Sequence, residues 1–108
     1  MPHDPHLADL MREALAGRSG IRETAMFGGI WWLLNGNMLC GAGTERFIFR
    51  VGRALAPEAL AMPGAETLSM KTRRMEGLVA VDADACLETG LDVWIELAAR
   101  CAGARPPR

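Results

Sequence analysis

Apolar residues recur at helical spacing near both ends of the chain. The first stripe, within residues 5–16, consists of Leu7, Leu10, Met11, Ala14 and Leu15. The second stripe consists of Leu91, Trp94, Ile95, Ala98 and Ala102. Because spacings of three and four residues fall on one side of an α-helix, both segments predict helices that pack on a core. Asp4 and Pro5 suit the start of the first helix, since aspartate caps N-termini and proline fits the first turn.

Short apolar runs separated by turn residues fill the middle of the chain. Asn35–Gly36 lies between two such runs and is the strongest short-range signal of a β-hairpin. Three antiparallel strands are expected within residues 23–51, and strands at 67–70 and 78–81 predict a second hairpin. Residues 53–62 between them predict a short helix with a proline near its first turn, where a missing N–H breaks no bond.

The predicted fold class is α+β, with helices packed on an antiparallel sheet in the order α-β-β-β-α-β-β-α. The 108 residues fit one compact domain, placed at residues 1–104 and followed by a short extended tail at 105–108. Half of the residues are hydrophobic, which excludes a disordered chain. The 12 basic and 13 acidic side chains exclude the one-sided charge of a general nucleic-acid coat.

The first predicted hairpin is apolar on both faces of the sheet. A two-residue loop at Asn35–Gly36 would place Trp32 opposite Leu39 and Trp31 opposite Cys40. One face then carries Ile30, Trp32, Leu34 and Leu39, and the other carries Trp31, Leu33, Met38 and Cys40. Because three short helices cover only one face, a second copy of the chain is expected on the other.

The expected assembly is therefore a homodimer with an interaction surface on this hairpin. That surface consists of Trp31, Trp32, Leu33 and Met38. Two alternatives stay open at this point: helices that pack on both faces of the sheet, or a loop one residue longer, which would shift the register.

The cytoplasm is the expected location. Three cysteines cannot all pair within one chain, and the first residues lack the basic and apolar blocks of a secretory signal. The longest apolar run, Ile30–Leu34, is too short to cross a bilayer, so no membrane association is expected.

Candidate catalytic and metal-binding residues are few. Cys40 has no histidine nearby in the sequence to activate it, so we interpret it as a core residue. His3 and His6 with Asp4 supply ligand types that zinc accepts, but two histidines on a terminus make a weak set. Asp82, with Asp84 close behind it, is interpreted as a turn or helix-cap residue. No catalytic residue, metal or cofactor is predicted.

Lys71, Arg73 and Arg74 form the one basic cluster of the sequence, and Arg50 and Arg53 could support them. Such a cluster can contact phosphates, so these residues are the candidate nucleic-acid site. A solvated hairpin loop is the favoured interpretation, because no aromatic residues are interleaved with the charges as in single-strand binders. Nucleic acid is therefore not an expected partner.

A Met-Phe-Gly-Gly run at a strand start, followed by a Gly-x-Met hairpin, resembles the N-terminal domain of the TfoX/Sxy competence-regulator family. The motif residues are Met26, Phe27, Gly28, Gly29, Asn35, Gly36 and Met38. Residues 73–82 and the tryptophan-bearing last helix are similar to stand-alone members of this family, so the resemblance covers about residues 6–102. Independently of the family, paired glycines inside a strand mark a bulge or a close backbone approach.

The resemblance implies a bacterial, often dimeric α+β domain. In two-domain members it is linked to transcriptional co-activation, so a partner from the transcription machinery or a regulator is expected. The first functional hypothesis is accordingly a non-enzymatic, homodimeric regulatory or protein-interaction domain. The alternative is a small-molecule-binding protein or enzyme with a pocket between sheet and helices, near Cys40 and Arg50.

Overall fold

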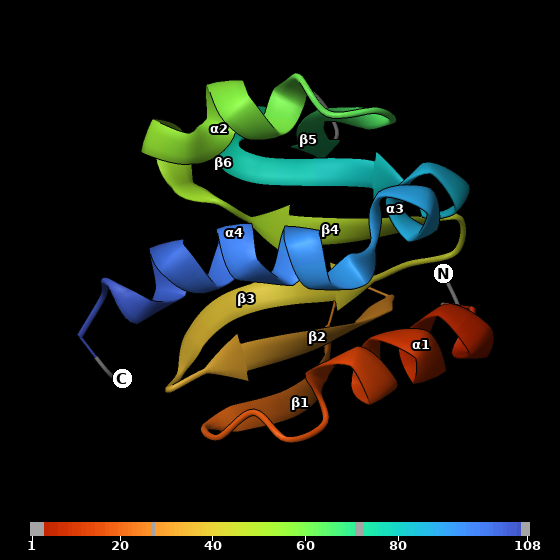
Figure 1. The fold of residues 1–108 in the computed structure, drawn as a ribbon, viewed down its shortest axis with the longest axis vertical. Coiled ribbons are helices and arrows are strands. Elements are labelled where there is room, and N and C mark those ends of the chain that lie inside the picture. The colour runs from red at the N-terminus through yellow and green to blue at the C-terminus, as the bar shows by residue number, and fades with distance from the viewer. Residues whose placement is uncertain (1–3, 27, 71–72, 107–108) are drawn as a thin grey trace.

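In residues 4–26, 28–70 and 73–106, which the computed structural model describes, four helices cover one face of a six-stranded antiparallel sheet (Figure 1). The helices are α1 (Pro5–Leu15), α2 (Gly52–Leu60), α3 (Ala83–Thr89) and α4 (Leu91–Gly103). The strands are β1 (Ile21–Met26), β2 (Gly29–Leu34), β3 (Asn37–Ala42), β4 (Arg46–Arg50), β5 (Ala65–Met70) and β6 (Arg73–Asp82). They lie in the order β1-β2-β3-β4-β6-β5. The α+β class is confirmed, with one strand and one helix more than predicted.

The glycine pair of the motif divides the first predicted strand into β1 and β2. These two strands pair as a hairpin with Met26 opposite Gly29. Gly28 has a φ of 76°, a left-handed conformation that side chains disfavour. The close backbone approach predicted for this pair is confirmed at Gly29, where a Cβ would lie 2.9 Å from the carbonyl oxygen of Ala42. Phe27 of the motif lies outside the described residues.

The predicted Asn35–Gly36 turn is confirmed. Both residues have positive φ, as a two-residue hairpin turn of this kind requires, and Leu34 faces Asn37 across it. The Asn37 side chain is buried, and its Nδ2 donates to the carbonyl oxygen of Pro106 at 3.0 Å. The beginning of the predicted tail is thereby held against the start of β3.

Leu33 faces Met38 as predicted, but a β-bulge in β3 overturns the predicted register beyond that pair. Trp32 faces Cys40 and Trp31 faces Gly41, so the expected pairs with Leu39 and Cys40 are wrong. Leu39 is the extra residue of the bulge, which turns Cys40 to the face that Leu39 also occupies. Both side chains pack in the core beneath the helices.

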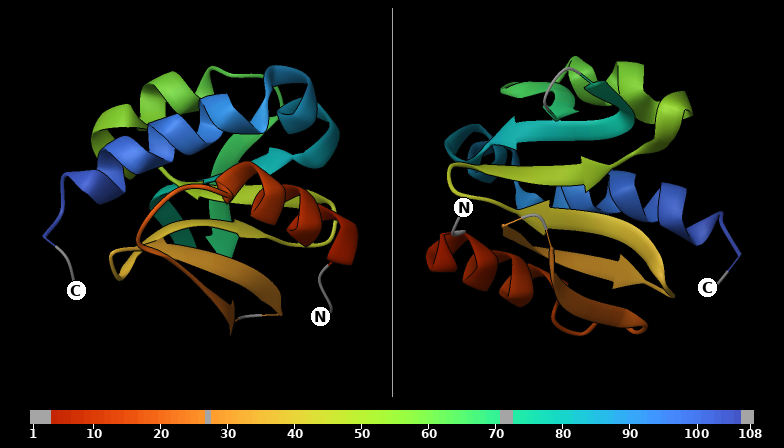
Figure 2. Two further views of the ribbon diagram at one scale, coloured as in Figure 1. Left: turned by 60° about the horizontal axis from the view of Figure 1, so that its bottom comes forward. Right: turned by 180° about the vertical axis from the view of Figure 1, so that it is seen from behind.

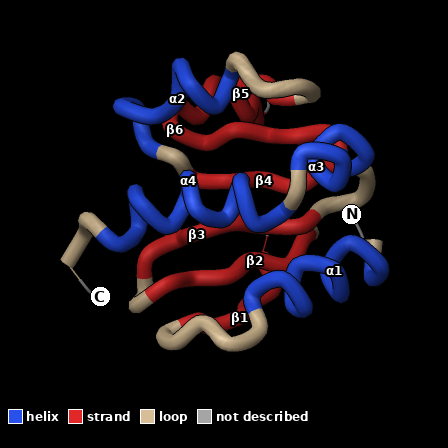
Figure 3. The backbone as a smooth tube through the Cα atoms, viewed as in Figure 1, coloured by secondary structure: helices blue, strands red, loops and turns tan. Residues whose placement is uncertain are grey.

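The helices of the described chain all lie on one face of the sheet (Figures 2 and 3), so helices on both faces are excluded. Their core includes the stacked rings of Phe49 and Trp94, whose centroids are 5.2 Å apart. Arg12 of α1 donates to both carboxylate oxygens of Glu23 in β1, at 2.7 and 2.9 Å. Glu23 also accepts from Nε1 of Trp32 at 3.1 Å, which joins helix, edge strand and core.

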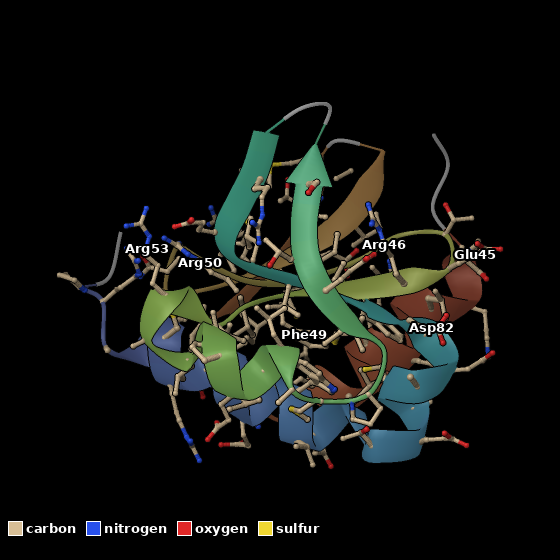
Figure 4. All side chains as sticks on the ribbon, turned by 90° about the horizontal axis from the view of Figure 1, so that it is seen from above. Glu45, Arg46, Phe49, Arg50, Arg53 and Asp82 are labelled. Atoms are coloured by element: carbon tan, nitrogen blue, oxygen red, sulfur yellow. The ribbon has the colours of Figure 1, made fainter. Side chains whose placement is uncertain are left out.

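The other face of the sheet, called the open face below, is buried by the sheet itself. A second apolar cluster there consists of Trp31, Ile48, Leu68 and Ala80. Strands β5 and β6 differ in length between two of their consecutive residue pairs. In that interval β5 contains one residue, Leu68, whereas β6 contains four residues, 75–78. This mismatch bends the β5–β6 hairpin away from the helices (Figure 4).

The interaction surface predicted for a dimer is wrong in its main part. Trp31 is 6% exposed and Trp32 is 2% exposed within a single chain, and they lie on opposite faces of the sheet. Leu33 and Met38, the other predicted members, are partly buried. The expectation failed because it treated the sheet as flat, whereas curvature lets one chain cover the second face.

Two further differences concern the segments that follow β4 and β6. Helix α2 begins at Gly52, so Pro57 lies beyond the first turn, where its missing N–H leaves the helix one bond short. After β6 the chain forms α3, which was not predicted as a helix. The cap assigned to Asp82 is confirmed, because its carboxylate accepts from the backbone N–H of Ala85 at 3.1 Å.

Gly41→Ala is expected to destabilise the protein through the open-face cluster. A Cβ at this position would lie 2.6 Å from Cε3 of Trp31 and 2.9 Å from Cδ2, so the indole would have to move. Overpacking of this kind lowers the free energy of unfolding by about 1–3 kcal/mol, which urea denaturation measures.

Gly103→Ala is the matched control, because a Cβ at this glycine of α4 has no neighbour within 4 Å among the described residues. Its free energy of unfolding should stay within about 0.5 kcal/mol of the parent. Equal stability of both variants would show that the Trp31 indole does not lie on Gly41.

Candidate functional site

One row of paired residues crosses all six described strands on the open face. The row runs through Thr24, Trp31, Gly41, Ile48, Ala80 and Glu66. Paired residues in antiparallel strands point to the same side, so this row is the floor of the face. Nε1 of Trp31 donates to the carbonyl oxygen of Met26 at 2.9 Å, which fixes the indole over Gly41. The middle of the floor, from Trp31 to Ala80, is therefore apolar and held in place, with Thr24 and Glu66 at its two ends.

Partly buried apolar side chains surround this floor. Met26 of β1, Met38 of β3, and Met75 and Leu78 of β6 pack against the buried cluster. Thioether side chains adapt to different surfaces and are frequent where a protein binds apolar partners. A partner laid on the open face would meet these methionines.

The motif glycines border a hollow at one end of β2. A cavity of about 290 Å³ is lined by Gly28, Gly29, Trp31, Ala42, Gly43, Thr44, Arg46 and Ile48. A neighbouring cavity of about 210 Å³ is lined by Glu45, Arg46, Gly64, Glu66, Ala80, Val81 and Asp82. Arg46 lines both cavities and points away from the helices (Figure 4).

The second half of the motif borders a hollow at the other end of β2. A cavity of about 540 Å³ is lined by Gly20, Ile21, Arg22, Leu33, Asn35 and Gly36. Arg22 faces Leu33 across the β1–β2 ladder, and Leu33 faces Met38, which belongs to the open-face cluster. Each end of β2 is thus marked by motif residues and by one arginine.

The open face carries more positive than negative charge. Arg46 and Arg50 flank Ile48 along β4, and Arg22 of β1 lies opposite Leu33. None of these three arginines has an ion pair within the described residues. Glu66 is the acidic residue of the floor row, while the carboxylate of Asp82, opposite Arg46, caps α3. The four helices, by contrast, carry seven acidic and three basic side chains in the described chain.

The predicted nucleic-acid cluster is only partly described, so it stays a prediction. Lys71 lies outside the described residues, and Arg73 is placed only by its backbone, at the start of β6. Arg74 donates to the hydroxyl oxygen of Thr67 at 3.4 Å. Arg53 pairs with Glu76 at 3.3 Å. Arg53 and Arg74 line one hollow beside α2, and Arg50 lies at the end of β4, opposite Leu78.

The structure supports the interpretation of Cys40 as a core residue. Cys40 and Cys86 are fully buried, and burial raises the pKa of both thiols, that of Cys86 to about 12. Cys40 lies beneath the helices and Arg50 lies on the open face, so these two residues do not line one pocket together. Cys101 is partly exposed.

Asp4, an N-terminal candidate for metal binding, has a structural role. Asp4 caps α1, with its Oδ1 accepting from the backbone N–H of His6 at 2.9 Å. Both residues line a cavity of about 430 Å³ that Glu45, Asp82 and Asp84 also border. Across residues 4–26, 28–70 and 73–106, no three such side chains are close enough to hold a metal ion, and His3 lies outside these ranges.

Comparisons with known proteins leave the resemblance to rest on its motif. The chain matches no protein-family model, no curated protein and no solved structure. Among the described helices, none is long and apolar enough to span a membrane.

Cys101 is expected to react with a thiol reagent such as DTNB far faster than the other two cysteines. Because burial raises the pKa of Cys86 from 9.0 to about 12, this residue has about a thousandfold less thiolate near pH 8 than a thiol with the ordinary pKa. The pKa of Cys40 is raised further. The folded protein should release one equivalent of thionitrobenzoate rapidly and the remainder only after denaturation.

Cys101→Ser is the control and should abolish the rapid phase. Rapid release of a second equivalent of thionitrobenzoate from the native protein would contradict the burial of Cys40 and Cys86. One of these thiols would then be a candidate functional group.

Proposed function

We propose that this chain is a non-enzymatic regulatory domain that binds a partner protein on its open face. The open face itself is the observation that supports this best: partly buried methionines border a fixed, buried apolar cluster, and motif residues line hollows at both ends of β2. In this proposal the TfoX-like motif shapes a binding surface, and the partner belongs to the transcription machinery or its regulators, as the resemblance implies.

The composition of the open face also favours a protein partner. Protein interfaces are enriched in methionine and arginine and depleted in lysine relative to the rest of the protein surface. The open face has this composition, with Met26, Met38 and Met75 beside the cluster and Arg22 and Arg46 at the ends of β2.

A homodimer remains a prediction that rests on the family resemblance. The physical argument for a dimer was that Trp31 and Trp32 needed a second chain to cover them. It no longer holds, because both tryptophans are buried within one chain. Dimerisation is therefore not needed to complete the core. The alternative, a small-molecule-binding protein or enzyme with a pocket between sheet and helices, also stays a prediction. Cys40 and Arg50 do not support it as a pair, since they lie on opposite faces of the sheet.

Met38→Glu is expected to abolish partner binding, because it places a charge among the apolar groups that a partner would cover. The full-length chain would carry an affinity tag, and captured proteins from an extract of the source organism would be quantified by mass spectrometry. Proteins that bind the open face should decrease by at least about tenfold relative to the parent.

Val93→Glu is the matched control, because Val93 is an exposed residue of α4 on the opposite side of the molecule. It should capture the same proteins as the parent. Leu33→Gln provides a milder open-face variant if Met38→Glu lowers the melting temperature. Identical captured sets from all the folded variants would refute the proposed binding surface.

A further inference from the structure

We propose that the hollow between α2 and the β5–β6 hairpin binds a small molecule that combines one carboxylate with a short apolar chain. The hollow lies on the helical side of the sheet, because Thr67 in its lining faces Val79, a core residue beneath the helices. This site is therefore separate from the open face, and the inference does not depend on the proposed function.

One face of α2 forms the apolar wall of this hollow, whose volume is about 240 Å³. Four residues of α2 line it at spacings of three and four, which place side chains on one side of a helix. They are Arg53, Ala56, Pro57 and Leu60. Leu60 is one of the few exposed large hydrophobic residues in the part of the chain that the structure describes. An apolar chain laid on this wall would remove it from water, which stabilises binding.

The backbone explains why the helix leaves this space open. The N–H of Val51 donates to the carbonyl oxygen of Gly77 at 2.9 Å, so the start of α2 is fixed against β6. The β5–β6 hairpin bends away from the helices (Figure 4), so α2 does not cover it completely. The hollow is thus a consequence of the same bend that closes the cluster on the open face.

Arg74 supplies the charge that selects a carboxylate. Its Nη2 donates to the hydroxyl oxygen of Thr67 at 3.4 Å, a long bond to a neutral group, and it has no ion pair within the described residues. Arg53 is paired with Glu76 at 3.3 Å, so these two charges balance each other. The lining therefore has one uncompensated positive charge, and a guanidinium can bind a carboxylate through two parallel hydrogen bonds.

The size and the lining of the hollow together define the ligand. Its volume is smaller than the roughly 300–1,000 Å³ of sites for drug-sized ligands, so the apolar chain must be short. A phosphate group would also satisfy Arg74, but a phosphate without an apolar chain would leave the wall of α2 in water. A carboxylate on an apolar chain matches both parts of the lining.

The probe is hexanoate, titrated into the ¹⁵N-labelled full chain and followed by NMR. Hexanamide is the matched neutral compound, and acetate is the acid without the chain. Hexanoate should cause saturable chemical-shift changes confined to α2, β5 and β6, with a Kd of about 1 mM or lower. Hexanamide, acetate and inorganic phosphate should each bind at least about fivefold more weakly, because each lacks one half of the match.

Arg74→Gln should weaken hexanoate binding by about fivefold or more and leave hexanamide binding unchanged, because it removes only the charge. Leu60→Ser should weaken binding of both compounds, because it removes part of the apolar wall. The matched controls are Arg100→Gln and Val93→Ser, since both residues are exposed on α4 and lie outside the hollow. All four side chains are exposed, so the variants should keep the melting temperature of the parent.

Absence of saturable shift changes with hexanoate would overturn this inference, and so would equal binding of hexanoate and hexanamide. Equal losses in Arg74→Gln and Arg100→Gln, or shift changes that map to the open face, would overturn it as well. Tighter binding of inorganic phosphate or an oligothymidylate that depends on Arg74 would replace the carboxylate by a phosphate ligand. Protein capture through Met38 tests the proposed function separately, so failure of one proposal leaves the other standing.

Discussion

The contact between the indole of Trp31 and the bare backbone of Gly41 is the interaction on which the open face depends. A tryptophan on a strand needs either a covering layer or a space on its own sheet. Gly41 provides that space in the neighbouring strand, and the hydrogen bond from Nε1 to Met26 fixes the ring there. The indole thereby lies flat on the sheet, and one chain can bury an apolar group on the face that has no helices.

Curvature completes what this contact begins. The four residues of β6 opposite a single residue of β5 bend the outer hairpin, so Leu68 and Trp31 join one cluster although their strands lie far apart in the sheet order. Gly77 permits the bend, with a φ of 86° and a backbone that approaches Gly52 closely. A flat sheet of the same sequence would expose these groups to water.

The motif acquires a physical meaning from this arrangement. Gly28 and Gly36 occupy backbone conformations that side chains disfavour, so both positions are explained by their turns alone. Those turns stand at opposite ends of β2, and each borders a hollow that also has an arginine in its lining. Residues selected for backbone geometry can therefore also define the ends of a binding surface, which unites the structural and functional interpretations of the motif.

Local patterns in the sequence determined the elements whose signals lie within a few residues. The capped first helix, the Asn35–Gly36 turn, the cap at Asp82 and the α+β class follow from capping, turn and periodicity rules, which depend on near neighbours. The break of the first strand at Gly28 and the bulge at Leu39 were missed because a glycine pair fits a hairpin as well as a strand, and because a bulge depends on cross-strand packing.

Only the tertiary structure decided what covers the second face. The sequence showed correctly that the Asn35–Gly36 hairpin is apolar on both sides, but two coverings satisfy that pattern: another chain, or the same sheet bent upon itself. Two features decide between these coverings. Gly41 leaves space for the indole of Trp31, and β5 and β6 have unequal numbers of residues between two of their residue pairs. Those residues are distant in sequence, and their relation exists only once all six strands are paired.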